Sequence, residues 1–92
     1  MLQLHFLCVC VVASMADASM DQRAYVAEWK AFRDRMLRTS PNASVLERLD
    51  CRDAFADATK HFALRSADLT TTNRMIVQMC VKAIGDHLQT LA

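Results

Sequence analysis

Residues 77–91 read VQMCVKAIGDHLQTL and decide the fold class. Apolar side chains recur here at the spacing of a single α-helical face. They are Val77, Cys80, Ile84, Leu88 and Leu91. We therefore expect a helix over residues 72–90, after a threonine run at 70–72 that offers capping oxygens. Gly85 either marks a close crossing of two helices or ends this helix early.

Two further helices are expected upstream of this stretch. In residues 20–38 the large apolar side chains step by four, three and four positions, so they share one helical face. They are Tyr25, Trp29, Phe32 and Met36. The segment Ser44-Val45-Leu46-Glu47 has the pattern of a capping box and opens a helix over residues 44–65.

Strand signals are absent, and glycine and proline occur once each, at Gly85 and Pro41. The sequence therefore predicts an all-α protein. Three amphipathic helices with short connections favour a small three-helix bundle, or a helical hairpin with one more helix packed on it.

The N-terminus has the pattern of a signal peptide. Residues 1–12 contain no Asp, Glu, Lys or Arg, and small residues follow them. Ala16-Asp17-Ala18 fits the cleavage pattern, so we predict a signal peptide over 1–18, a mature domain over 19–92, and secretion. The alternative is the buried first helix of a cytosolic protein. The apolar run is shorter than the ~20 residues that cross a bilayer, so we expect no transmembrane anchor.

In the oxidising compartment that secretion implies, the placement of the cysteines predicts a disulfide. Cys8 and Cys10 lie in the predicted leader, which leaves Cys51 and Cys80 in the mature chain. Two cysteines in a small secreted domain favour one disulfide, which would add stability to a small core. Two free thiols or an intermolecular bond are the alternatives.

Asn42-Ala43-Ser44 is a sequon for N-glycosylation, and it lies in an expected loop. We therefore name Asn42 as a candidate glycosylation site. Ser44 is also explained fully as a helix cap, so a chance match is the competing interpretation.

The face of Tyr25, Trp29, Phe32 and Met36 has two interpretations. It forms either the core side of its helix or a face that binds a partner or an apolar ligand. Four basic residues among and just after these positions offer a surface for anionic groups, or simply a solvated face. They are Lys30, Arg33, Arg35 and Arg38.

Catalysis and metal binding lack sequence support. Phosphate loops and nucleophile elbows need several glycines, and Gly85 is the only one. His61, His87 and Asp57 do not have the spacing of metal ligands. The formal net charge of +1 gives no electrostatic case for nucleic acid. We expect no enzymatic activity, metal or cofactor.

These patterns favour a secreted helical interaction module that binds an extracellular protein. The alternative is a carrier of a small apolar ligand, with a homodimer as one form of it. In size and class the chain resembles secretoglobins, which implies a dimer around an apolar cavity. Secretoglobins have cysteines near both chain ends, whereas Cys51 and Cys80 are internal, so no functional residue is carried across. Membrane-surface binding by the basic first helix is a third hypothesis.

Overall fold

The structure is a computed structural model that describes residues 18–91, with side chains from residue 22 onward. It contains the helices α2 (Ala18–Leu37), α3 (Val45–Arg65) and α4 (Thr71–Thr90), with a 3₁₀ turn, η1 (Ser66–Asp68), before α4. No strand occurs over residues 18–91, which confirms the all-α fold class. Residues 1–17, on which the predicted signal peptide and its two cysteines depend, lie outside the described residues.

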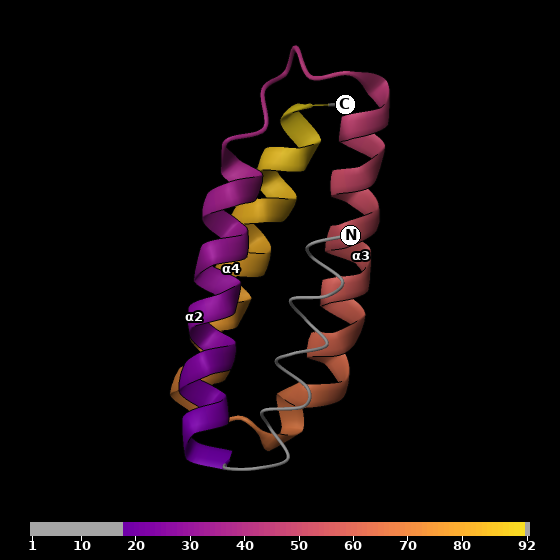
Figure 1. The fold of residues 1–92 in the computed structure, drawn as a ribbon. Helices are drawn as coiled ribbons and strands as arrows, with labels where there is room; N and C mark the ends of the chain where they lie inside the picture. Colours follow the sequence, from indigo (N-terminus) through magenta and orange to yellow (C-terminus); the bar gives the residue numbers. More distant parts are fainter. Residues whose placement is uncertain (1–17, 92) are drawn as a thin grey trace.

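The three helices run alternately along one axis (Figure 1). α2 and α4 point in the same direction, and α3 returns antiparallel to both. Contacts at the two ends fix this arrangement. At one end, Asn73 Nδ2 donates to Gln22 Oε1 over 2.8 Å. At the other end, His87 Nε2 donates to the carbonyl of Thr39 over 2.9 Å.

The buried core lies between α2 and α4. Every large apolar position of the predicted α2 face is buried, and so is the apolar stripe of α4. The α2 residues are Tyr25, Val26, Trp29, Phe32 and Met36, and those of α4 are Val77, Cys80, Ile84 and Leu88. Leu69 and Leu91 close the core at the beginning and end of α4. Burial of these side chains supplies most of the free energy that holds the two helices together.

α3 contributes much less to this core. Ala58 is its one buried residue, while Phe55 and Phe62 are only partly buried against the core. The Phe62 ring meets Trp29 edge to face, with 6.2 Å between centroids. α3 therefore covers the α2–α4 pair without being enclosed by it.

Side-chain caps begin α3 and α4. Ser44 Oγ accepts from the Glu47 amide over 3.1 Å, as the capping pattern predicts. Thr70 Oγ1 accepts from the Asn73 amide over 3.2 Å in the same way. Each bond satisfies one of the amides that an α-helix leaves without a partner in its first turn.

α4 passes through Gly85 and ends at Thr90, so the glycine does not end the helix early. Gly85 has no positive φ. A Cβ at this position would lie 3.7 Å from the Phe55 ring of α3, an ordinary van der Waals distance. Gly85 therefore packs against the Phe55 ring, but its backbone conformation is one that any residue can adopt.

Over residues 18–91, no helix combines the length and the hydropathy needed to cross a bilayer.

Candidate functional site

The aromatic face predicted on α2 is part of the core. Tyr25 is 0% exposed, Trp29 2%, Phe32 4% and Met36 2%. These side chains pack against α4 and the inner side of α3, so they offer no surface to a partner or ligand. This corrects the interpretation of the α2 face as a binding site, because the other two helices cover it.

One polar contact ties α3 to α2 within this buried region. The Tyr25 hydroxyl lies 3.1 Å from His61 Nδ1, at hydrogen-bond distance. The Arg65 guanidinium lies over the Tyr25 ring, 4.7 Å from its centroid. A ring buried to this degree gains from both a partner for its hydroxyl and a cation over its face. The cluster fixes α3 against α2.

Among the described residues, Cys51 and Cys80 are free thiols. Thr39 contacts Cys51 Sγ at 3.5 Å through its hydroxyl, and its carbonyl bonds His87. Cys51 is therefore level with His87, about two helical turns, or ~10 Å, from Cys80. A disulfide needs Cα atoms about 4.4–6.8 Å apart. The predicted Cys51–Cys80 bond is thus not formed, because the register of α3 against α4 separates the two side chains.

Cys80 is a buried residue of α4, and Lys30 and Arg33 of α2 lie near its thiol. Burial raises the pKa of the Cys80 thiol above its ordinary value, and the nearby positive charges of Arg33 and Lys30 oppose that rise. Arg33 also bonds Asp34 Oδ1 at 3.0 Å, which raises the pKa of Arg33 itself. The raised pKa favours the neutral thiol over the thiolate, which is the reactive form.

The remaining predicted site residues lie at the surface or do not converge. Asn42 is exposed in the α2–α3 connection, where its backbone N–H donates to Ser40 Oγ over 3.0 Å. Asn42 thus stays a candidate for glycosylation. The part of the chain that the structure describes contains no group of three or more residues placed to hold a metal ion.

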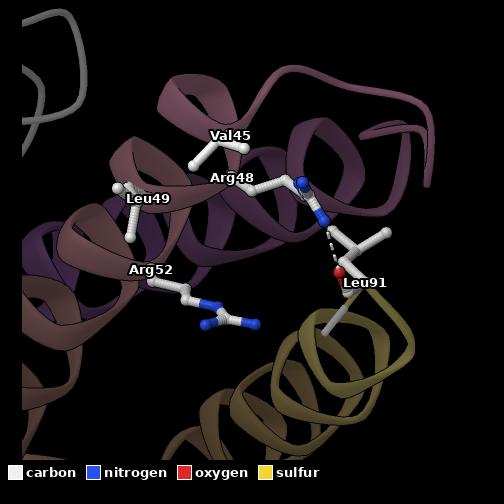
Figure 2. A pocket seen from close by; sticks show the side chains of 5 residues that line it. All are labelled: Val45, Arg48, Leu49, Arg52 and Leu91. Atoms are coloured by element: carbon white, nitrogen blue, oxygen red, sulfur yellow. Dashed lines mark hydrogen bonds between the residues drawn. The ribbon is translucent and has the colours of Figure 1, made fainter.

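A pocket of about 260 Å³ opens where the first turns of α3 meet the end of α4 (Figure 2). We call it the end pocket. Its lining consists of three apolar side chains and two arginines, namely Val45, Leu49, Leu91, Arg48 and Arg52. Arg48 Nη1 donates to the carbonyl of Leu91 over 3.0 Å, so Arg48 is held against the end of α4. Arg52 extends from α3 toward α4 one turn further along.

Among the described residues, the lining of the end pocket carries two positive side chains and no acidic one. Arg48 and Arg52 are four residues apart on one helix, a like-charge spacing that costs about 0.2–0.5 kcal/mol. Arg48 lies at the end of the first turn of α3 and Arg52 one turn further along, and the carbonyl at the end of α4 reaches the same opening. Neither guanidinium has a carboxylate within 4.0 Å among the residues that the structure describes. The pocket therefore combines an apolar lining with two guanidinium groups.

A second exposed feature follows the solvent side of α3. Leu46 is 68% exposed and Leu64 is 83% exposed. They are separated by 18 residues, roughly five full turns, so they lie on the same side of the helix. Three exposed aspartates lie between them, namely Asp50, Asp53 and Asp57. We call these five residues the α3 outer face.

Neither feature was identified from the sequence. The signals were present, because Arg48 and Arg52 stand at helical spacing beside Val45 and Leu49. The packing of α2 and α4 determines which side of α3 faces the core. The sequence of α3 alone therefore does not show which of its side chains stay exposed.

Comparison of the chain with models of protein families, with curated proteins and with solved structures finds no match.

Proposed function

We propose that this chain is a secreted helical interaction module that binds an extracellular protein partner through the α3 outer face. Its role is binding rather than catalysis. One observation carries the proposal. Of the 21 residues of α3, only Ala58 is buried, while Leu46 is 68% and Leu64 83% exposed. A helix with one buried residue, which carries exposed leucines at both ends of a row of aspartates unpaired among the described residues, supports a surface that contacts another molecule.

The charges of the α3 outer face favour a basic partner. None of its aspartates has an ion-pair partner among the described residues. Asp53 and Asp57 are four residues apart on the helix, a spacing at which like charges repel. A partner surface with Lys or Arg between two apolar contacts would relieve that repulsion, and it would also be steered toward α3. The same acidic row disfavours a second copy of this chain at this face, because two acidic surfaces repel.

Secretion belongs to the same proposal. It is supported by the apolar, charge-free run over residues 1–12 and the small residues before Ser19. Expression of the full coding sequence in a eukaryotic host, followed by the intact mass of protein from the medium, tests it. Loss of the first 16 to 18 residues is expected. Retention of the full chain inside the cell would contradict it.

Binding is tested with the tagged protein in medium conditioned by cells of its source. We compare the wild type with the double variant Leu46→Ser/Leu64→Ser, and quantify retained proteins by mass spectrometry. The matched control is Met75→Ser/Met79→Ser, which alters two exposed apolar residues of α4, 56% and 70% exposed. All four side chains are largely in solvent, so each double variant should keep its stability within about 1 kcal/mol, at roughly 0.5 kcal/mol per site.

We expect a basic protein that saturates on the wild type and the control, and is lost from the α3 variant. The purified partner should bind more weakly as ionic strength rises, because surface charges are screened. Equal retention by all three proteins, or self-association that the α3 variant abolishes, would contradict the proposal.

A further inference from the structure

We infer that the end pocket is a binding site for a small organic anion, a carboxylate joined to a short apolar chain. The pocket is lined on α3 and α4 by residues outside the α3 outer face. This inference can therefore hold or fail independently of the proposed partner.

The two arginines define the anionic end of the ligand. Arg48 is half-buried, and its Nη1 bond to the Leu91 carbonyl orients its guanidinium at the pocket wall. Its Nε is buried without a hydrogen-bond partner. Arg52 is exposed on the pocket side of α3, and nothing in the described residues neutralises it. Guanidinium groups bind carboxylates through short charge-assisted hydrogen bonds, often two at a time.

A structural role explains only part of this pair. Arg48 satisfies a carbonyl at the end of α4, which is a known use of a basic side chain. Arg52 makes no such contact, and it adds a second positive charge to the same opening. Two cations at this spacing on α3 repel each other in the free protein. A bound anion relieves that repulsion.

The remaining lining defines the rest of the ligand. Val45 is 64% exposed and Leu49 is 49% exposed, and both line the opening together with Leu91. Covering them removes apolar surface from water, which an inorganic anion would not achieve. The volume of about 260 Å³ lies just below the usual 300–1,000 Å³ of ligand pockets. The ligand class is therefore a short-chain carboxylic acid rather than a bulky lipid.

Three probes separate these contributions. Octanoate has both the anion and the chain, octanol has the chain alone, and acetate has the anion alone. Binding to the full chain is measured by isothermal titration calorimetry. Amide chemical shifts are followed in parallel at Leu49, Arg52 and Leu91. Octanoate should bind in a saturable way and shift these amides, and it should bind at least tenfold more tightly than octanol or acetate.

Arg52→Gln removes the positive charge with a side chain of similar length. The control, Arg23→Gln, changes an exposed arginine near the beginning of α2, outside the lining of the end pocket. We expect Arg52→Gln to weaken octanoate binding about tenfold, from the loss of a charge-assisted hydrogen bond, and Arg23→Gln to leave it unchanged. Leu49→Ala should weaken octanoate without affecting acetate. Octanoate binding that survives Arg52→Gln, shifts confined to the core around Trp29, or acetate binding as tightly as octanoate would each overturn the inference.

Discussion

Replacing Gly85 with alanine should stabilise this protein. The residue lies inside α4, with a backbone conformation that any L-residue adopts. Glycine in a helix interior is about 0.8–1.0 kcal/mol less favourable than alanine. The added methyl would lie 3.7 and 3.8 Å from two atoms of the Phe55 ring, and each carbon pair at that separation gains about 0.1–0.2 kcal/mol. Together these effects raise the unfolding free energy by about 1 kcal/mol.

Thermal and urea unfolding, followed by circular dichroism at the helical band, measure this change. For a domain of this size, about 1 kcal/mol corresponds to a rise in Tm of roughly 4–8 °C. The reciprocal control is Ala83→Gly, two residues earlier in the same helix, which should lower stability by a similar amount. A Tm for Gly85→Ala at or below that of the wild type would refute the reasoning. It would mean that Phe55 lies closer to α4 than an alanine allows.

Three further predictions follow from the core, the thiols and the caps. Urea unfolding should show that Ile84→Ala lowers the free energy of unfolding by about 2–5 kcal/mol. Leu64→Ala should change it by less than about 0.5 kcal/mol. Equal losses would contradict the assignment of the core. Maleimide should label Cys51 in the native protein and Cys80 only after unfolding. Because burial raises the pKa of Cys80, the folded state holds that proton more tightly, so stability should fall as pH rises above the ordinary thiol range. Rapid native labelling of Cys80, or stability that rises over that range, would oppose this. Ser44→Ala should cost about 1 kcal/mol by removing the bond to the Glu47 amide, and no loss in thermal unfolding would show that the cap is unimportant.

The sequence predicted the helices well because their signals are local. Periodic apolar positions placed α4, and the capping residues Ser44 and Thr70 placed the beginnings of two helices. The observed helices begin and end within two residues of the expected bounds. The burial of Trp29 follows from the same periodicity, since a wide apolar face on a short chain needs a partner helix.

The register and rotation of α3 could not be predicted in the same way. Its sequence offers apolar residues on two sides, with Leu49 on one and Phe55 on the other. In the folded protein, α3 packs against the α2–α4 pair through the side with Phe55, and Leu49 stays about half exposed. The same choice of register places Cys51 beside Thr39 rather than Cys80, which is why the expected disulfide is not formed.

Native-state hydrogen exchange of individual amides tests most directly whether α3 lies outside the main core, as expected of a helix that offers its outer face to a partner. Exchange free energies report how much of the structure must open to expose each amide. We predict that the central amides of α2 and α4 exchange only through global unfolding, while those of α3 exchange through a smaller opening that needs less free energy. Protection of α3 equal to that of α2 and α4 would contradict this. It would show that α3 belongs to one cooperative core, and that its exposed leucines and aspartates are ordinary surface residues.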